Sequence, residues 1–266
     1  MKLEGVNREV AAEFLGTFVL MAFGLGVNAQ VLLGKSNAGD FFSINIGWGL
    51  GVAFGIYVAG SVSGAHMNPA VTLALAVFRR FSWKKVLPYF GGQFLGAFVA
   101  AAVIYGVYHE GIAAYDGGTR QILGDLGTAG IFGTYPNSYL STLGGLVDQI
   151  FGTALLCMMV FALADNVNQH NPGLKIGPLV VGAVVMAIGM AVGLNAGYAI
   201  NPARDFSPRL FTALAGWGWD VFRVYDYWWW VPIVGPCIGG VVGGAAYELL
   251  VCRHHPPAHN EETSLS

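Results

Sequence analysis

Charged residues divide the chain into long apolar stretches. Six apolar stretches carry no Asp, Glu, Lys or Arg, and they contain 21, 38, 24, 16, 28 and 21 residues: 14–34, 41–78, 86–109, 149–164, 176–203 and 227–247. About 20 helical residues, rising about 1.5 Å each, cross the hydrocarbon core of a bilayer. The pattern therefore predicts an all-α membrane protein with six transmembrane helices.

Two of these stretches, 41–78 and 176–203, are too long for a single crossing. A continuous helix over the 38 residues of the first would measure roughly 57 Å, whereas the hydrocarbon core is about 30 Å thick. Each of the two must therefore hold a spanning helix together with a further segment at membrane depth.

The composition excludes other classes of protein. Of 266 residues, 55% are hydrophobic and 11% are charged, whereas soluble domains carry about 25% charged residues, which argues against a soluble enzyme. The net charge of −2 gives no basic patch for nucleic acid. Cys157, Cys237 and Cys252 lie in or beside apolar stretches and indicate no disulfide framework. We expect a lipid bilayer around the chain, and no metal, cofactor or catalytic residue.

The Lys and Arg residues are distributed unevenly between the predicted loops. With the N-terminus in the cytoplasm, eight of them fall on that side and four on the other, leaving Arg204 aside. Because positive residues concentrate in short cytoplasmic loops, we expect both termini in the cytoplasm.

An internal repeat divides the chain into two halves. Asn68-Pro69-Ala70 recurs 133 residues later as Asn201-Pro202-Ala203, and Gln149 occupies the place of Glu13. Each half has three predicted spans, an odd number, so the second half enters the membrane from the opposite side. We expect a single channel domain over 1–253, with inverted halves at about 8–109 and 144–252, an outer connection at 110–143 and a disordered cytoplasmic tail at 254–266.

The two Asn-Pro-Ala motifs fall in the surplus of the two over-long stretches. Asn is a strong helix N-cap and Pro is favoured at the first helical position, so each motif predicts a re-entrant half-helix that starts near the midplane. The irregular segments before them would expose backbone carbonyls to a watery path, while the Asn amides donate hydrogen bonds there. We expect these carbonyls on Gly64, Ala65, His66, Gly197, Tyr198 and Ala199.

Four ionisable residues lie within or beside apolar segments. Arg204 follows the second motif, and a buried Arg at a narrow path would donate to solute oxygens and repel cations. Glu13 and Glu248 are expected to be structural acids that hydrogen-bond the irregular segments. His66 is expected to be a neutral ring satisfied within its loop or, alternatively, a sensor of cytoplasmic pH.

With these residues, the chain resembles the major intrinsic protein family, in its aquaglyceroporin branch. The likeness is carried by residues 12–17, 63–72 and 197–205. It implies a selectivity filter made of Trp48, Gly189, Tyr198 and Arg204, in which Gly189 leaves room for a larger solute. It further implies a plasma-membrane homotetramer with one pore per chain, which conducts glycerol, water and urea.

Two other functions remain open from the sequence. A secondary transporter shares inverted repeats and broken helices, but it would need ion-coupling acids near the midplane, for which Glu13 and Glu248 are the available candidates. A structural junction protein with a closed pore is the second alternative.

Overall fold

The computed structural model describes residues 3–256. These residues form nine α-helices: α1 (Gly5–Leu33), α2 (Phe41–Ser63), α3 (Pro69–Val77), α4 (Val86–Asp116), α5 (Thr142–Leu163), α6 (Gly173–Ala196), α7 (Pro202–Thr212), α8 (Val224–Tyr227) and α9 (Val231–Leu250). No β-strand occurs in this part of the chain.

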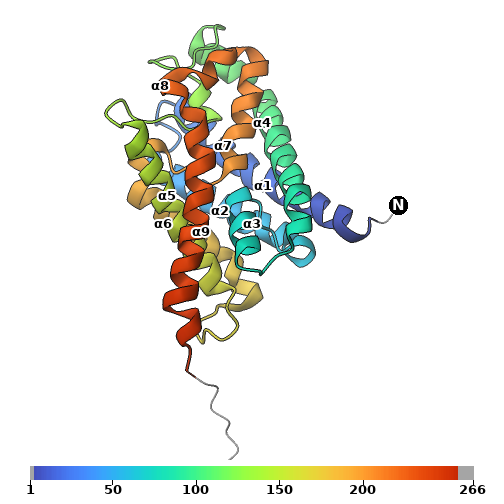
Figure 1. The fold of residues 1–266 in the computed structure, drawn as a ribbon. Coiled ribbons are helices and arrows are strands. Elements are labelled where there is room, and N and C mark those ends of the chain that lie inside the picture. Colours follow the sequence, from blue (N-terminus) through green and yellow to red (C-terminus); the bar gives the residue numbers. More distant parts are fainter. Residues whose placement is uncertain (1–2, 257–266) are drawn as a thin grey trace, which may run out of the picture.

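Six of the helices within residues 3–256, namely α1, α2, α4, α5, α6 and α9, are long and apolar enough to cross a membrane. They form a bundle around the short helices α3 and α7 (Figure 1). The prediction of six transmembrane helices is therefore confirmed.

The short helices α3 and α7 contain 9 and 11 residues, about half of what a bilayer crossing needs. They occupy the over-long apolar stretches, and each starts at the proline of an Asn-Pro-Ala motif. The two predicted half-helices are thus confirmed.

The two halves of the chain interlock. In the first half α1 packs against α2 and α4, and in the second α5 packs against α6 and α9. Each short helix packs against the last long helix of the other half, α3 against α9 and α7 against α4. The centre of the bundle is therefore built from both halves, as an inverted repeat requires.

Polar side chains lie inside the bundle and large apolar ones face outward. Glu13, Gln93 and Gln149 are fully buried, whereas Leu87 is 77% and Leu174 is 97% exposed. This distribution is the reverse of that in a soluble protein and suits a lipid environment, in which polar groups must find partners within the protein.

Glycine allows the closest helix contacts. A Cβ on Gly96 in α4 would collide with the carbonyl oxygen of Phe14 in α1. The same collision, with Ile150 of α5, would occur at Gly239 in α9. Small residues of this kind let helix backbones approach closely in a membrane.

The region predicted to be a disordered tail, 254–266, is described only in part. Residues 257–266 lie outside the described residues. Before them, His254 ends a 3-10 turn and the Nε2 atom of His255 lies 2.8 Å from Oδ2 of Asp165.

Candidate functional site

The two short helices meet at their N-termini through a reciprocal exchange of hydrogen bonds. The Oδ1 atoms of Asn68 and Asn201 cap their own helices, at Ala70 N and at Ala203 N. The Asn68 amide donates to the carbonyl oxygen of Ile200 at 2.8 Å, and the Asn201 amide donates to that of Met67 at 2.9 Å. Each amide keeps one further N–H that can serve a solute.

The irregular segments before α3 and α7 have matching backbones. Positive φ values recur 133 residues apart, at 50° and 49° for Ala65 and Met67 and at 36° and 45° for Tyr198 and Ile200. L residues adopt this region rarely, and it persists where the surroundings impose it.

The unusual backbone leaves acceptors free. Among the residues that the structure describes, no hydrogen bond reaches the carbonyl oxygens of six residues that border the cavities described below. These are the six predicted positions: Gly64, Ala65, His66, Gly197, Tyr198 and Ala199.

Glu13 of α1 holds the first irregular segment. Its carboxylate accepts from the Ser63 hydroxyl at 2.6 Å, from the backbone N–H groups of His66 and Met67 at 2.9 and 2.7 Å, and from the Gln93 amide at 2.7 Å. In the second half the Oε1 atom of Gln149 accepts from the N–H of Ile200 at 3.1 Å. All accessible oxygens of Glu13 are thus engaged, which leaves it poorly suited to bind a coupling ion.

Glu248 lies elsewhere than we expected from the sequence. Its carboxylate pairs with the guanidinium of Arg80 at 2.9 Å, just beyond the C-terminal end of α3, and about a quarter of it is exposed. It therefore anchors the end of the half-helix and not the irregular segment before it. The reason is its position near the end of α9, where a cation is within reach and the midplane is not.

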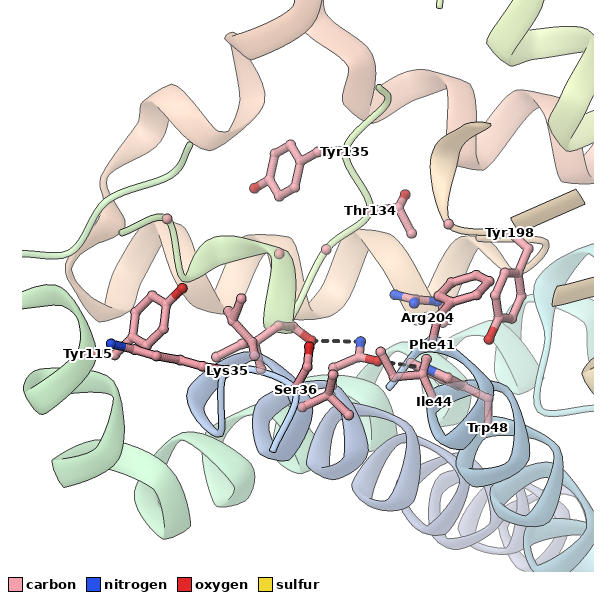
Figure 2. Close-up of a pocket in the computed structure, with 18 residues that line it drawn as sticks. Lys35, Ser36, Phe41, Ile44, Trp48, Tyr115, Thr134, Tyr135, Tyr198 and Arg204 are labelled. Carbon is pink, nitrogen blue, oxygen red and sulfur yellow. Dashed lines mark hydrogen bonds between the residues drawn. The ribbon is translucent and has the colours of Figure 1, made fainter. Parts of the chain in front are cut away.

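Two cavities extend into the bundle from opposite ends. One has a volume of about 630 Å³ and is lined partly by the long loop 117–141 (Figure 2); we call it the loop-side cavity. The other, of about 560 Å³, passes His66, Asn68 and Asn201 and reaches the α5–α6 connection; we call it the terminal-side cavity. Three residues line both cavities, namely Trp48, Tyr198 and Arg204. The cavities therefore meet at these side chains.

Arg204, in the first turn of α7, is 6% exposed. Its guanidinium carbon lies 4.2 Å from the centre of the Trp48 ring, and its Nη1 donates to the Phe132 carbonyl at 3.4 Å. Within residues 3–256 no carboxylate pairs with it. The neighbouring Asp205 instead pairs with Arg209 at 2.9 Å, so the positive charge of Arg204 acts on the path.

The Asp205–Arg209 pair fixes the long loop. Asp205 accepts from the backbone N–H and the hydroxyl of Thr134, at 2.7 and 2.5 Å. Arg209 donates to the carbonyl oxygens of Thr134 and Val221, at 2.5 and 3.0 Å. Both side chains are fully buried, and a buried pair is tolerated when its remaining groups are hydrogen-bonded in this way.

Gly189 lies behind Tyr198 and lines neither cavity. A Cβ at this position would collide with Oδ1 of Asn45 and would lie 2.6 Å from the Tyr198 ring. The space that the sequence analysis assigned to a larger solute is thus filled by the tyrosine. The glycine acts on the path indirectly, because it lets Tyr198 lie back against α6.

His66 borders the terminal-side cavity. Its Nδ1 lies 3.1 Å from the Thr72 hydroxyl, and its ring packs edge-on against Phe81 at 4.7 Å and against Tyr89 at 5.0 Å. The imidazole is satisfied within its own surroundings.

The fold and the site define a class of protein: a multi-pass membrane protein with two half-helices that meet between two solute-sized cavities. Comparison with known proteins gives the family. The model of the major intrinsic protein family matches residues 2–247, and the chain belongs to that family. Because proteins of this family are channels, the chain is a channel and not an enzyme.

Similar proteins lie in the branch that the motifs indicated. The chain is 48% identical over 250 residues to human Aquaporin-9, which covers 94% of this chain and 84% of the relative. It is 44% identical over 244 residues to Aquaglyceroporin-2 of Rhizophagus irregularis, covering 92% and 77%. The solved aquaglyceroporin of Plasmodium falciparum superposes with a TM-score of 0.85 at 34% identity, covering 94% of this chain and 98% of that one. The resemblance to aquaglyceroporins is confirmed.

Several residues around the site were not found from the sequence. Asn28, Gln93 and Thr134 hydrogen-bond site residues or their supports. Asn28 could have been noticed as a lone amide in an apolar stretch, since polar residues in a membrane span are by default functional candidates.

Proposed function

We propose that the chain is a passive channel that conducts glycerol and other small uncharged solutes, including water and urea, and excludes ions and protons. The observation that carries the proposal is the meeting of the two cavities at Trp48, Tyr198 and Arg204. Two aromatic walls and one guanidinium suit a solute with a carbon backbone on one side and hydroxyl groups on the other. The names of the similar proteins, Aquaglyceroporin-2 and the Plasmodium aquaglyceroporin, support the same solute class.

In this proposal the free carbonyl oxygens and the two Asn amides replace the water that a solute loses. A hydroxyl group donates to a carbonyl of the 64–66 or 197–199 segment and accepts from Asn68 or Asn201. The exchange occurs step by step, because the acceptors follow one another along the path.

Exclusion of cations and protons follows from the charges around the path. Arg204 has no carboxylate partner in the described chain. The N-termini of α3 and α7, each equivalent to about half a positive charge, face the same region. A cation would lose its hydration at a site where every nearby formal or partial charge of this kind repels it.

The proposal is tested by stopped-flow light scattering on purified protein in liposomes, with glycerol and water as permeants. We expect glycerol flux well above that of empty liposomes, without saturation and without dependence on an ion gradient. Flux no greater than background favours a closed junction protein, and gradient-dependent flux favours a secondary transporter.

The variant Gly189→His tests the filter residues in the same assay. An imidazole at this position must displace Tyr198 toward the path, because no space exists behind the ring. We expect glycerol flux to be lost while water flux is retained. Unchanged glycerol flux would contradict the assignment of Trp48, Gly189, Tyr198 and Arg204.

His66 is proposed as a pH sensor on the cytoplasmic side, because it borders the terminal-side cavity and contacts Thr72 beside Asn68. We expect glycerol flux to change between about pH 5 and pH 7.5, the range in which imidazoles titrate. The variant His66→Ala should lack this change. If the variant keeps the pH dependence of the parent, the role is wrong.

We further propose a homotetramer in the plasma membrane, with both termini in the cytoplasm and one path per chain. Each chain already encloses its cavities, and its outward faces carry exposed apolar side chains such as Leu87 and Val107. Native mass spectrometry of detergent-solubilised protein tests the assembly, and antibody access to tagged termini in intact and permeabilised cells tests the orientation.

A further inference from the structure

The side chain of Asn28 in α1 bridges the Trp48 ring and the long loop. Its Oδ1 accepts a hydrogen bond from the indole Nε1 of Trp48 at 3.1 Å, and its Nδ2 donates to the carbonyl oxygen of Ile131 at 3.2 Å (Figure 2). An amide is a short neutral side chain that accepts and donates at once, and both capacities are used here.

These bonds complete a closed ring of contacts around the place where the cavities meet. Asn28 reaches Ile131, and the next carbonyl along the loop, that of Phe132, accepts from Arg204. The guanidinium of Arg204 in turn lies over the Trp48 ring at 4.2 Å. The ring joins α1, α2, the long loop and α7.

Helix α1 also supports the face of the Trp48 ring. A Cβ on Gly24, one turn before Asn28, would collide with the six-membered part of the indole. Positions four residues apart lie on the same face of a helix. The same stripe of α1 therefore contacts the indole at its face through Gly24 and at its N–H edge through Asn28.

From this arrangement we propose that Asn28 is a positioning residue for solute selectivity: it fixes the plane of Trp48 and thereby the space between the indole and Arg204. The proposal rests on the proposed function, in which these two residues bound the narrowest part of the path. Asn28 lines the loop-side cavity and acts on the solute through Trp48. Without it, the indole loses its hydrogen-bond partner and gains freedom to turn.

The test uses Asn28→Leu, which has a similar volume and neither donates nor accepts. Glycerol and a four-carbon polyol are compared by stopped-flow measurements in liposomes. We expect the permeability ratio of the larger polyol to glycerol to rise about threefold to tenfold, the range that loss of one hydrogen bond of ordinary net strength gives. Gln30→Leu is the matched control, since Gln30 is an exposed amide on the same helix that bonds only the Ala38 carbonyl, and it should leave the ratio unchanged.

A double-mutant cycle with Trp48→Phe separates positioning from general destabilisation. Phenylalanine has no N–H, so Asn28→Leu should change the ratio little further in that background. An equal effect of Asn28→Leu in both backgrounds, or no effect beside Trp48, would overturn the proposal. If N28L does not fold, Asn28→Ala makes the same test.

The cycle also separates this proposal from the proposed function. If Trp48→Phe alone leaves the polyol ratio unchanged, the filter assignment fails. If Trp48→Phe raises the ratio and Asn28→Leu does not, the filter assignment stands and the role of Asn28 is wrong.

Discussion

The carboxylate of Glu13 stabilises backbone that no helix or sheet could satisfy. Four donors converge on its two oxygens, two of them backbone N–H groups of a segment with positive φ values. In the second half Gln149 provides one acceptor oxygen for the equivalent N–H of Ile200. The first irregular segment thus depends on its acid more than the second depends on its amide.

We therefore expect Glu13→Gln to destabilise the protein. One of the two oxygens becomes an NH₂ group, so buried donors face a donor, at a cost of about 1–3 kcal/mol for each group left unsatisfied. The measurement is thermal unfolding in detergent. Glu110→Gln at an exposed site of α4 is the control, and equal melting temperatures for the two variants would contradict the prediction.

At the scale of the helices, glycine decides how closely neighbours approach. Gly96 and Gly106 both belong to α4, but only Gly96 meets the backbone of α1; around Gly106 there is open space. The two positions therefore separate the packing role of glycine from its low helix propensity.

We expect Gly96→Ala and Gly106→Ala to have opposite effects. A Cβ at position 96 forces α1 and α4 apart, and overpacking of this kind typically costs about 1–3 kcal/mol. A Cβ at position 106 has room and should stabilise the helix by about 0.5–1 kcal/mol. Unfolding of both variants in detergent gives the comparison, and a stabilising effect at position 96 would show that the contact is looser than described.

The helices could be predicted from the sequence to the extent that their signals are local. Stretches free of charge gave the six spans, and the Asn-Pro pairs gave the starts of α3 and α7, because capping involves residues within one turn. Asn68, Asn201 and Arg204 were conspicuous because they are polar within apolar surroundings.

Contacts between distant parts of the chain carry no such local signal. Asn28 meets Ile131 across 103 residues, and Thr134 meets Asp205 across 71. The relation of Gly189 to Tyr198 and the pairing of Glu248 with Arg80 likewise depend on how helices pack. Such contacts become visible only once the bundle is assembled.

At the scale of the whole molecule, one carboxylate joins three separate segments on the side of the C-terminus. Asp165, just after α5, accepts from the hydroxyl of Tyr247 in α9 at 2.9 Å, and its Oδ2 lies 2.8 Å from Nε2 of His255. Partial burial raises the pKa of Asp165, but hydrogen bonds from His255, from the N–H of Val167 and from Tyr247 together hold that pKa at about 2.

This lowered pKa predicts how stability depends on pH. A carboxylate whose pKa is lower in the folded protein contributes stability above its unfolded pKa, and the contribution is lost as pH falls through the folded value. The difference in melting temperature between the parent and Asp165→Asn should thus be constant above about pH 5 and shrink between about pH 4 and pH 2. For Asp125→Asn, at an exposed site, we expect no such change, and a constant difference for Asp165→Asn down to pH 2 would contradict the prediction.

The interlocking of the halves has a consequence for biosynthesis. Helix α3 packs against α9, which ends at Leu250, so its partner emerges from the ribosome about 150 residues after it does. Until then the first half-helix has reached the membrane without the wall against which it rests. The path cannot be closed off from lipid by the first half alone, and it is completed only when the last helix has been inserted.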